Sequence, residues 1–414
     1  MTALENTGKL SKKASLFIAG KGSEYKNSML TAISSALKEN AQYIEEENKK
    51  DLANARSNGI SEAMCDRLLF DTKRIFACAD AVIKVTELSD PVGEVMEKVT
   101  RPNGLILEKV RVPMGVVGII YESRPNVTVD TAVLCLKASN AVILRGGKEA
   151  INTNTAIVKV MKKALSDMGA DENLIGFVED TSRESANEMM KLKDCIDVLI
   201  PRGGAGLINA VVHNSTIPVI ETGVGNCHVY VDKSADIKKA VDIVLNAKLS
   251  RPSVCNAMET LLVHKDVGDD FYKAVDKAFC EKNVKVYAKG IAKEKLTSVR
   301  EATDEDFMTE FLDYAVSVKS VESVEEAIEH IAKYSTRHSE CIVTEDKEIA
   351  EVFTALVDAA AVYVNASTRF TDGFEFGFGA EIGISTQKLH ARGPMGLKEI
   401  TSYKYVIKGN GQVR

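Results

Sequence analysis

The chain has 414 residues, which at about 150 residues per domain predicts two or three domains with room for a core that needs no disulfide or metal. Its 53 Lys and Arg residues against 59 Asp and Glu residues leave a net charge of -6. This balance argues against a nucleic acid or an anionic membrane as a partner.

The first residues are too polar and acidic for a signal or transit peptide. No apolar stretch approaches the roughly 18 residues that a membrane span needs. The eight cysteines stand at single positions without a CxxC pair, which argues against a zinc knuckle or a dithiol motif. We therefore expect a cytoplasmic protein with reduced thiols and no bound metal.

Apolar residues recur at helical spacing over residues 4–87, which predicts a helical layer. Residues 105–112 alternate between apolar and charged, as in a half-exposed strand, and residues 400–407 repeat that pattern. These two strands can pair with each other. The sequence between these two strands, after Pro113, follows a different hydrophobic pattern.

After Pro113, short apolar runs alternate with helical segments, which predicts strands buried on both faces of a parallel sheet. A second set of the same kind begins at Cys227. We therefore expect two α/β domains with doubly wound parallel sheets. The predicted strands are 116–120, 141–144, 174–178 and 197–200, then 227–231, 259–263, 285–288, 314–318, 341–344 and 361–365, and the helices of the first set are 130–139, 153–168 and 182–193.

Cys255 is the cysteine best suited to chemistry. It follows Pro252 in a loop just before a strand, with Arg251 close by, and α/β proteins place reactive groups on such loops. Cys227 stands beside His228, but neighbours on a strand point to opposite faces, so we favour a structural role for this pair. The other six cysteines read as packing or surface thiols.

Four further strand ends carry candidate groups. Residues 197–209 run from a strand through glycines into a helix, and residues 141–148 end in Arg145, two glycines and Lys148. Both suit a phosphate or a ribose, although glycine clusters are more often plain turns. Asn126 after Pro125 is either an oxyanion donor or a helix cap, with Arg124 beside it for an anionic substrate. Glu221 precedes a glycine turn as a general base or a capping carboxylate.

In this order, the segments resemble the aldehyde dehydrogenase superfamily, over essentially the whole chain. The strings at 122–128, 251–259 and 327–340 are most similar to its glutamate-5-semialdehyde dehydrogenase branch. Glu122-Ser-Arg-Pro-Asn126 and Arg145-Gly-Gly-Lys148 depart from the general superfamily pattern, and they suit an anionic acyl phosphate better than a hydrophobic aldehyde.

The resemblance implies an aldehyde dehydrogenase-like α/β fold with a strand arm that joins protomers into a dimer or tetramer. The cofactor-binding domain is expected at 1–98, 113–223 and 366–395, the catalytic domain at 224–365, and the oligomerisation arm at 99–112 with 396–414.

The resemblance also implies an activity: NADPH-dependent reduction of L-glutamyl 5-phosphate to the 5-semialdehyde and phosphate, the second step of proline biosynthesis. Cys255 is then the nucleophile and Asn126 an oxyanion donor. Because phosphate departure replaces hydrolysis, Glu221 is either structural or handles a proton. The implied cofactor-binding residues are Arg145, Gly146, Lys148, Gly203, Gly204 and Glu310, and the candidates for binding substrate anions are Arg124, Arg251 and Arg369.

Two rivals stay open, another aldehyde- or acyl-reducing relative and an inactive scaffold with the same fold. The two cations Arg145 and Lys148 favour NADPH over NADH. The resemblance also leaves open a partnership with a glutamate 5-kinase that supplies the labile acyl phosphate.

Overall fold

The protein was analysed as a computed structural model that describes residues 2–414, without the side chain of residue 63. The chain forms two compact units. The first comprises Met1–Thr222, Gly377–Gly383 and Met395–Arg414, and the second comprises Gly223–Phe376 and Ile384–Pro394. No helix within residues 2–414 is long and apolar enough to cross a membrane.

The first unit begins with the predicted helical layer. Side chains of Thr2, Ser61 and Asp71 accept hydrogen bonds from backbone N–H groups and so cap three of its helices. Met29 and Ile33 are fully buried, as the helical spacing predicts. The helices are α1 (Ala3–Ile18), α2 (Ser23–Glu39), α3 (Ala41–Ser57), α4 (Glu62–Leu68) and α5 (Thr72–Glu87).

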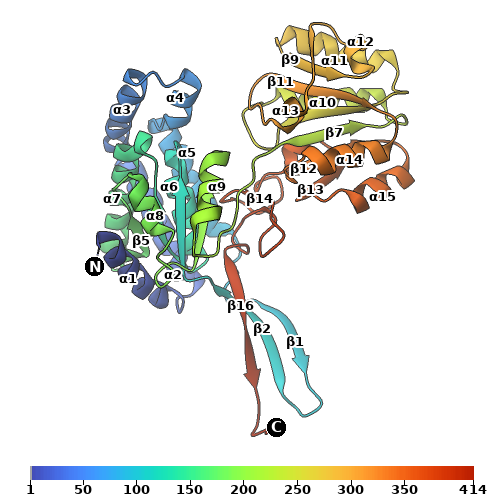
Figure 1. The fold of residues 1–414 in the computed structure, drawn as a ribbon. Helices are drawn as coiled ribbons and strands as arrows, with labels where there is room; N and C mark the ends of the chain where they lie inside the picture. The colour runs from blue at the N-terminus through green and yellow to red at the C-terminus, as the bar shows by residue number, and fades with distance from the viewer. Residues whose placement is uncertain (1) are drawn as a thin grey trace. The chain divides into compact units, whose positions relative to one another are not determined.

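A four-stranded parallel sheet in the order β5-β4-β3-β6 forms the centre of this unit (Figure 1). Every residue of β3 and β4 is buried, which confirms the prediction of strands covered on both faces. The strands are β3 (Val116–Tyr121), β4 (Ala141–Arg145), β5 (Ile175–Phe177) and β6 (Val198–Arg202), and the helices that follow them are α6 (Pro125–Lys137), α7 (Ile151–Asp167), α8 (Arg183–Met189) and α9 (Ala205–Asn214).

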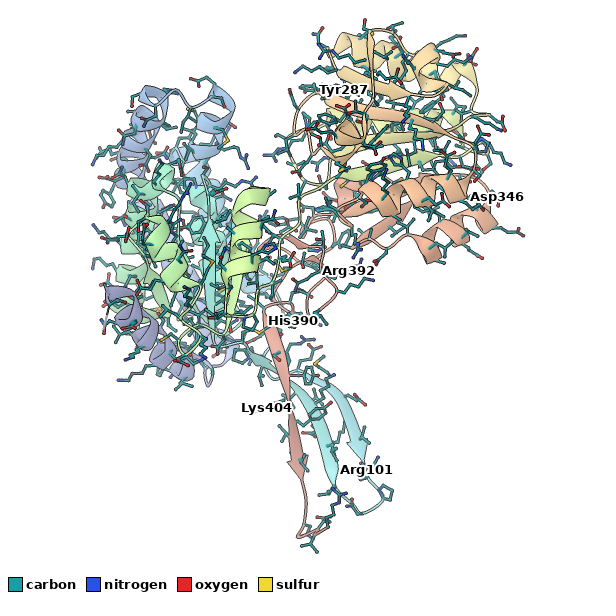
Figure 2. All side chains as sticks on the ribbon, viewed as in Figure 1. Arg101, Tyr287, Asp346, His390, Arg392 and Lys404 are labelled. Atoms are coloured by element: carbon teal, nitrogen blue, oxygen red, sulfur yellow. The ribbon has the colours of Figure 1, made fainter. Side chains whose placement is uncertain are left out.

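Three antiparallel strands form a separate ribbon in the order β1-β2-β16, ending near the C-terminus (Figure 1). β2 (Ile106–Pro113) pairs with β16 (Thr401–Lys408) over eight residues, which confirms the predicted pairing. β1 (Val95–Thr100) was not predicted, and all six of its residues are exposed. Figure 2 shows the side chains along this ribbon, with Arg101 and Lys404 labelled.

The second unit is built on a seven-stranded parallel sheet in the order β10-β9-β11-β8-β7-β12-β13. The predicted β/α alternation is confirmed, and the three-residue β10 was missed. The strands are β7 (Cys227–Val231), β8 (Met258–His264), β9 (Lys285–Lys289), β10 (Val299–Glu301), β11 (Ala315–Val321), β12 (Ser339–Val343) and β13 (Ala361–Val364).

Two hydrophobic clusters cover the two faces of this sheet. Val229 and Leu261 belong to one cluster, and their neighbours Tyr230 and Leu262 belong to the other, because successive residues of a strand point to opposite faces. The helices are α10 (Ile237–Leu249), α11 (Asp269–Glu281), α12 (Ala292–Lys295), α13 (Asp304–Met308), α14 (Val324–Tyr334) and α15 (Lys347–Leu356), and a short hairpin joins β14 (Ile384–Ser385) to β15 (Gly393–Pro394).

The compact units differ from the predicted domains in one region. Residues 366–395 were assigned to the cofactor-binding domain, but 366–376 and 384–394 belong to the second unit. The reason is local packing, because the Thr368 hydroxyl donates to the Asn256 carbonyl at 2.8 Å and the Asn256 amide donates to the Thr371 carbonyl at 3.0 Å. The arm packs with the first unit, and its first strand begins at Val95 rather than at residue 99.

Candidate active site

Cys255 lies in the loop between α10 and β8, at the amino end of that strand. Pro252 lacks a backbone N–H and so prevents the loop from continuing α10. Cys255 is partly exposed and Cys280, on α11, is exposed, whereas the other six cysteines are buried and none of the eight forms a disulfide. Cys255 is therefore the cysteine that combines access with a position on a loop, as a nucleophile requires.

Asn256 attaches this loop to the segment around Arg369. The buried Asn256 amide donates to the carbonyls of Arg369 at 3.2 Å and Thr371 at 3.0 Å, and its side-chain oxygen accepts a hydrogen bond from the Arg369 guanidinium. The Arg369 Nε also donates to the Ser250 hydroxyl at 3.2 Å. Residues 250–257, which we call the nucleophile loop after the predicted role of Cys255, are thereby held at both ends by residues more than 100 positions further along the chain.

Arg369 also contributes positive charge near Cys255. Burial lowers the pKa of Arg369 from its ordinary value, and the like charge of Arg251 lowers it further, while Cys255 opposes both effects. Arg251, Arg369 and Cys255 therefore interact electrostatically within the second unit. Cations beside a thiol favour the thiolate and also attract an anionic ligand.

Glu310, which follows α13, binds the backbone segment that packs against the same loop. Its Oε1 accepts a hydrogen bond from the Gly225 N–H at 2.7 Å. A Cβ at Gly225 would lie 1.5 Å from the Cys255 carbonyl oxygen. The backbone at residue 225 therefore touches the nucleophile loop so closely that only glycine fits.

A buried ion pair supports the strand that follows Cys255. Lys248 on α10 donates to the Oε2 of Glu259 on β8 at 2.6 Å, and both side chains are fully buried. Burial raises the pKa of Glu259 to about 7 and lowers that of Lys248, while the attraction within the pair opposes both shifts. This pair was not predicted from the sequence, because neither residue has a distinctive neighbour in the chain.

In the first unit, Asn126 is exposed in the first turn of α6, after Pro125, which starts the helix. Its Nδ2 donates to Asp130 Oδ2 at 2.8 Å. This bond fixes the orientation of the amide and leaves its second N–H for another acceptor. The preceding Ser123 has a φ of 42°, a conformation rare for residues other than glycine and common at functional sites.

Arg124 and Glu221 also belong to the first unit. Arg124 is the partly buried N-cap residue of α6, two positions before Asn126. Glu221 is partly buried and follows Ile220, whose N–H donates to the Leu199 carbonyl of β6 at 2.9 Å. The next residue, Thr222, donates to the Pro201 carbonyl at 2.6 Å. The segment that carries Glu221 is thus an extension beside β6.

The predicted glycine turn, Gly203 and Gly204, joins β6 to α9. Gly204 is the N-cap of α9, no side chain caps that helix end, and a Cβ at Gly204 would meet nothing within 4 Å. No role was predicted for Glu122, whose carboxylate packs against this turn. Its Oε2 accepts the Gly204 N–H at 3.0 Å and would lie 2.4 Å from a Cβ at Gly203.

Arg145 ends β4 and is buried. Its guanidinium donates to the carbonyls of Thr181 at 2.6 Å and Ser182 at 2.8 Å, and so holds the loop before α8. Burial lowers its pKa from the ordinary value. Lys148, in contrast, has an exposed side chain. Of the two predicted cations, Lys148 faces solvent and Arg145 organises the neighbouring loop.

Gly146 is required where β4 ends, because a Cβ there would lie 2.3 Å from the Asn154 amide nitrogen. β4, β3 and β6 are neighbours in one parallel sheet, so their carboxyl ends share an edge. The structure therefore brings Arg145, Gly146, Gly203 and Gly204 to one edge of the sheet, together with Glu122.

These residues fit a nicotinamide cofactor. The N-terminus of α9 is exposed, and no side chain caps the N–H groups of its first turn, since Glu122 accepts the N–H of the preceding Gly204. Uncapped N–H groups at a helix start suit a phosphate group. Lys148 supplies an exposed cation at the same sheet edge. In the second unit, Glu310 supplies a carboxylate beside the nucleophile loop, and carboxylates accept hydrogen bonds from ribose hydroxyls.

The predicted site residues thus form two sets. Cys255, Arg251, Arg369 and Glu310 lie together in the second unit, and Asn126, Arg124, Arg145, Gly146, Lys148, Gly203, Gly204 and Glu221 lie in the first. Residues that sequence reasoning missed are Asn256, Gly225 and Glu122, and the strings Cys-Asn, Gly-Val-Gly-Asn and Tyr-Glu-Ser were the available signals.

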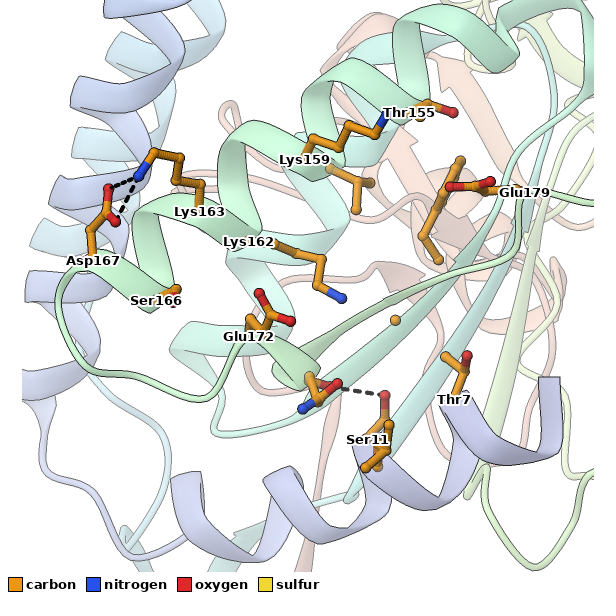
Figure 3. Close-up of a pocket in the computed structure, with 15 residues that line it drawn as sticks. Thr7, Ser11, Thr155, Lys159, Lys162, Lys163, Ser166, Asp167, Glu172 and Glu179 are labelled. Atoms are coloured by element: carbon orange, nitrogen blue, oxygen red, sulfur yellow. Dashed lines mark hydrogen bonds and ion pairs between the residues drawn. The ribbon is translucent and has the colours of Figure 1, made fainter. Parts of the chain in front are cut away.

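The first unit also contains a cavity of about 550 Å³ between α1, α7 and β5 (Figure 3). Lys163 pairs there with Asp167 at 2.8 Å, and the Ser11 hydroxyl donates to the Asn173 carbonyl at 2.9 Å. None of the predicted site residues lines this cavity. It is therefore separate from the candidate active site.

Comparison with known proteins gives a consistent result. The aldehyde dehydrogenase family matches residues 19–317 of this chain. A protein from Clostridium botulinum named gamma-glutamyl phosphate reductase is 57% identical over 407 residues, which is 98% of each chain.

Solved structures are similar as well. The gamma-glutamyl phosphate reductase from Thermotoga maritima has a TM-score of 0.97 and 47% identity, and all of both chains is covered. An acetylating aldehyde dehydrogenase from Geobacillus thermoglucosidasius has a TM-score of 0.71 at 19% identity, with 99% of this chain and 97% of that chain covered. The second similarity concerns the fold alone.

Proposed function

This chain belongs to the aldehyde dehydrogenase family, and we propose that it reduces L-glutamyl 5-phosphate to L-glutamate 5-semialdehyde and phosphate with NADPH, the second step of proline biosynthesis from glutamate. Two relatives named gamma-glutamyl phosphate reductase match it over 98% and 100% of their own length. The observation that carries the proposal is the accessible Cys255 on a loop that contains Arg251 and is hydrogen-bonded by Arg369.

Cys255 is the nucleophile. Its thiolate attacks the acyl carbonyl carbon of the substrate, the carbon–oxygen bond to phosphate breaks, and phosphate leaves with the bonding electrons. A thioester then links the glutamyl group to the Cys255 sulfur. Arg369 and Arg251 favour the thiolate and bind the anionic groups of the substrate, and Arg124 is a third candidate for that binding.

Asn126 and the Cys255 backbone N–H stabilise the oxyanion that forms during the attack. Asp130 holds the Asn126 amide through the 2.8 Å hydrogen bond, so this donor is oriented before substrate binds. Because phosphate departs and no water has to be activated, Glu221 acts as a structural carboxylate or in proton handling.

We propose cofactor-binding roles for residues at the sheet edge of the first unit and, separately, for Glu310 of the second unit. Gly203, Gly204 and Lys148 receive its phosphates, Arg145 and Gly146 shape the loop beside them, and Glu310 binds a ribose hydroxyl. When bound, the reduced nicotinamide supplies the hydride that converts the thioester into the aldehyde. The exposed positive charge of Lys148 favours NADPH over NADH, since a 2′-phosphate is anionic.

The ribbon formed by β1, β2 and β16 is proposed to join protomers into a dimer or tetramer. Both of its outer strands carry exposed apolar side chains, such as Val95, Met96, Tyr405 and Ile407, and an open strand edge is a template for pairing. A Tyr405→Lys variant should shift the mass measured by light scattering toward that of one chain; an unchanged mass contradicts this role.

A glutamate 5-kinase is the proposed partner that supplies the acyl phosphate. Both proteins would act in the reducing cytoplasm.

The proposed reduction is tested by supplying L-glutamate, ATP and a purified glutamate 5-kinase, then following the loss of NADPH absorbance on addition of this protein. The proposal predicts consumption that requires the kinase and ATP, faster with NADPH than with NADH. A Cys255→Ala variant should lose about three orders of magnitude or more in rate. Full activity of that variant would remove Cys255 from the mechanism.

A further inference from the structure

A second cysteine, Cys227, contacts the backbone of the nucleophile loop. It is the first residue of β7, its side chain is fully buried, and β7 pairs with β8, the strand that follows Cys255. The Cys227 sulfur lies 3.1 Å from the Cys255 carbonyl oxygen. This distance is that of a thiol S–H donating to a carbonyl.

The donor is available because Cys227 stays protonated. Burial raises the pKa of the Cys227 thiol well above its ordinary value, and nearby Glu340 raises it further. Cys227 is therefore a poor nucleophile and a stable S–H donor. These properties are the opposite of those needed at Cys255.

The backbone just before Cys227 also makes a close contact with the Cys255 carbonyl. Gly225, two residues before Cys227, approaches so closely that a Cβ would lie 1.5 Å from the Cys255 oxygen. The Gly225 N–H is held by Glu310 at 2.7 Å, and the Asn226 amide donates to the carbonyls of Phe307 at 2.7 Å and Tyr334 at 2.8 Å. The segment that carries Cys227 is thus itself rigidly placed.

Cys227 also begins a buried chain of polar contacts. Its sulfur lies 3.7 Å from His338 Nδ1, which lies 2.8 Å from the Ser339 hydroxyl, and that hydroxyl lies 2.6 Å from the Thr371 hydroxyl. Burial lowers the pKa of His338 to about 4, so the ring is neutral near pH 7. His338 Nε2 has no hydrogen-bond partner among the described residues, which favours the tautomer with its proton on Nδ1.

The series of polar contacts that begins at Cys227 leads back to the nucleophile loop. The Thr371 carbonyl accepts a hydrogen bond from the amide of Asn256, the residue after Cys255. Cys227 therefore holds the Cys255 carbonyl, and Thr371 holds the next side chain. Together these contacts fix the peptide group that joins Cys255 to Asn256.

We propose that Cys227 is a positioning residue for Cys255: its thiol donates to the Cys255 carbonyl and keeps the nucleophile loop in the orientation that catalysis requires. The inference rests on the proposed role of Cys255 as the nucleophile. A small displacement of a reacting group is enough to slow a reaction by one or two orders of magnitude. Loss of this contact should lower kcat while KM for either substrate stays close to its original value.

The test compares three variants of the full chain. Cys227→Ala removes the donor, and Cys227→Ser retains an O–H donor at the same position. Cys341→Ala is the matched control, because the Cys341 thiol is equally buried on the adjacent strand β12 and also donates to a backbone carbonyl, that of Ala366 at 3.0 Å. Each variant is measured for kcat, for KM, for thermal midpoint and for the rate at which iodoacetamide alkylates Cys255, located by mass spectrometry.

We expect Cys227→Ala to lower kcat by about tenfold and to change the Cys255 alkylation rate, with KM within twofold. Cys227→Ser should recover most of the lost kcat. Cys341→Ala should lower the thermal midpoint by a similar amount and keep kcat within twofold. The proposal is overturned if Cys227→Ala keeps the original kcat, if it loses no more than Cys341→Ala, or if Cys227→Ser gives no recovery. A parallel Cys255→Ala variant separates the two claims, since activity in that variant refutes the nucleophile itself.

Discussion

At the scale of single residues, the site depends on donors and charges placed before substrate arrives. Asn126 is held by Asp130, and Asn256 is held by three groups of the 369–371 segment. Both amides therefore have a fixed orientation. For Asn126, which retains an N–H for the oxyanion, no rotation is needed during the reaction, and this is the condition under which a donor stabilises a transition state most strongly.

Replacing Asn126 by alanine should therefore lower kcat by about 100- to 1000-fold, since the variant lacks one of the two oxyanion donors. KM should change little, because the oxyanion exists only in the transition state. Steady-state kinetics measure both values. Asn54→Ala, at an exposed position of α3, is the control and should retain full activity; a small effect of Asn126→Ala would assign the oxyanion to other groups.

Asp130 makes stability depend on pH in a defined direction. Burial raises its pKa from 3.8 to about 6 in the folded protein, against a smaller opposing effect of the Asn126 hydrogen bond. Between about pH 4 and 6 the folded protein retains a proton that the unfolded chain has released, so stability should fall as the pH rises through this range. Thermal midpoints recorded at several pH values should decline less steeply over this range in Asp130→Asn than in the original protein. Identical slopes would contradict the assignment.

Part of the site could be predicted from sequence because the signal is local. Cys255 stands out through Pro252 and the strand that follows, and Asn126 through the preceding proline. The role of Arg145 could not be predicted, because its guanidinium bonds to carbonyls at Thr181 and Ser182, which only tertiary folding brings close. The same holds for the contact between Asn256 and Thr371, which are 115 positions apart.

At the scale of elements, burial decides what the sequence reveals. The strands buried on both faces form apolar runs, and their positions were predicted to within a few residues. β1 lacks this pattern because all six residues are exposed, and β2 alone defines it through pairing. β10 has three residues, and its pairing with β9 is what makes it a strand.

Gly225 tests how closely two elements meet at the nucleophile loop. In Gly225→Ala the new Cβ would overlap the Cys255 carbonyl, so the loop must shift, and kcat should fall by about 100-fold. Gly268→Ala is the matched control, since a Cβ there meets nothing within 4 Å, and it should be fully active. Equal activity of the two variants would show that the loop tolerates the shift.

The ion pair between α10 and β8 makes a prediction about stability. Lys248→Met leaves the Glu259 carboxylate buried without its partner, which should destabilise the fold by about 3–5 kcal/mol. Urea unfolding monitored by circular dichroism measures the change. The double variant Lys248→Met with Glu259→Leu should recover much of the loss, because no uncompensated charge remains. A single variant as stable as the original would show that the charge is relieved by other means.

At the scale of the whole molecule, the net charge of -6 contrasts with the anionic ligands of the proposed reaction. The protein places its cations locally: Arg251 and Arg369 near Cys255, and Lys148 at the sheet edge of the first unit. The α/β class, the presence of two units and the pairing of the arm strands were predicted from the sequence pattern. Residues 366–376 and 384–394 pack with the second unit rather than with the first, because contacts rather than chain order decide where a returning segment packs.

The central claim is that the enzyme interconverts the semialdehyde with an acyl phosphate rather than with a free carboxylate. It is tested most directly in the reverse direction, with glutamate 5-semialdehyde and NADP⁺ supplied with and without inorganic phosphate, while NADPH absorbance is recorded. The claim of an acyl phosphate predicts NADPH formation that depends on phosphate, because phosphate must attack the Cys255 thioester to release the product. Formation at the same rate without phosphate would contradict it and indicate hydrolysis of the thioester by water.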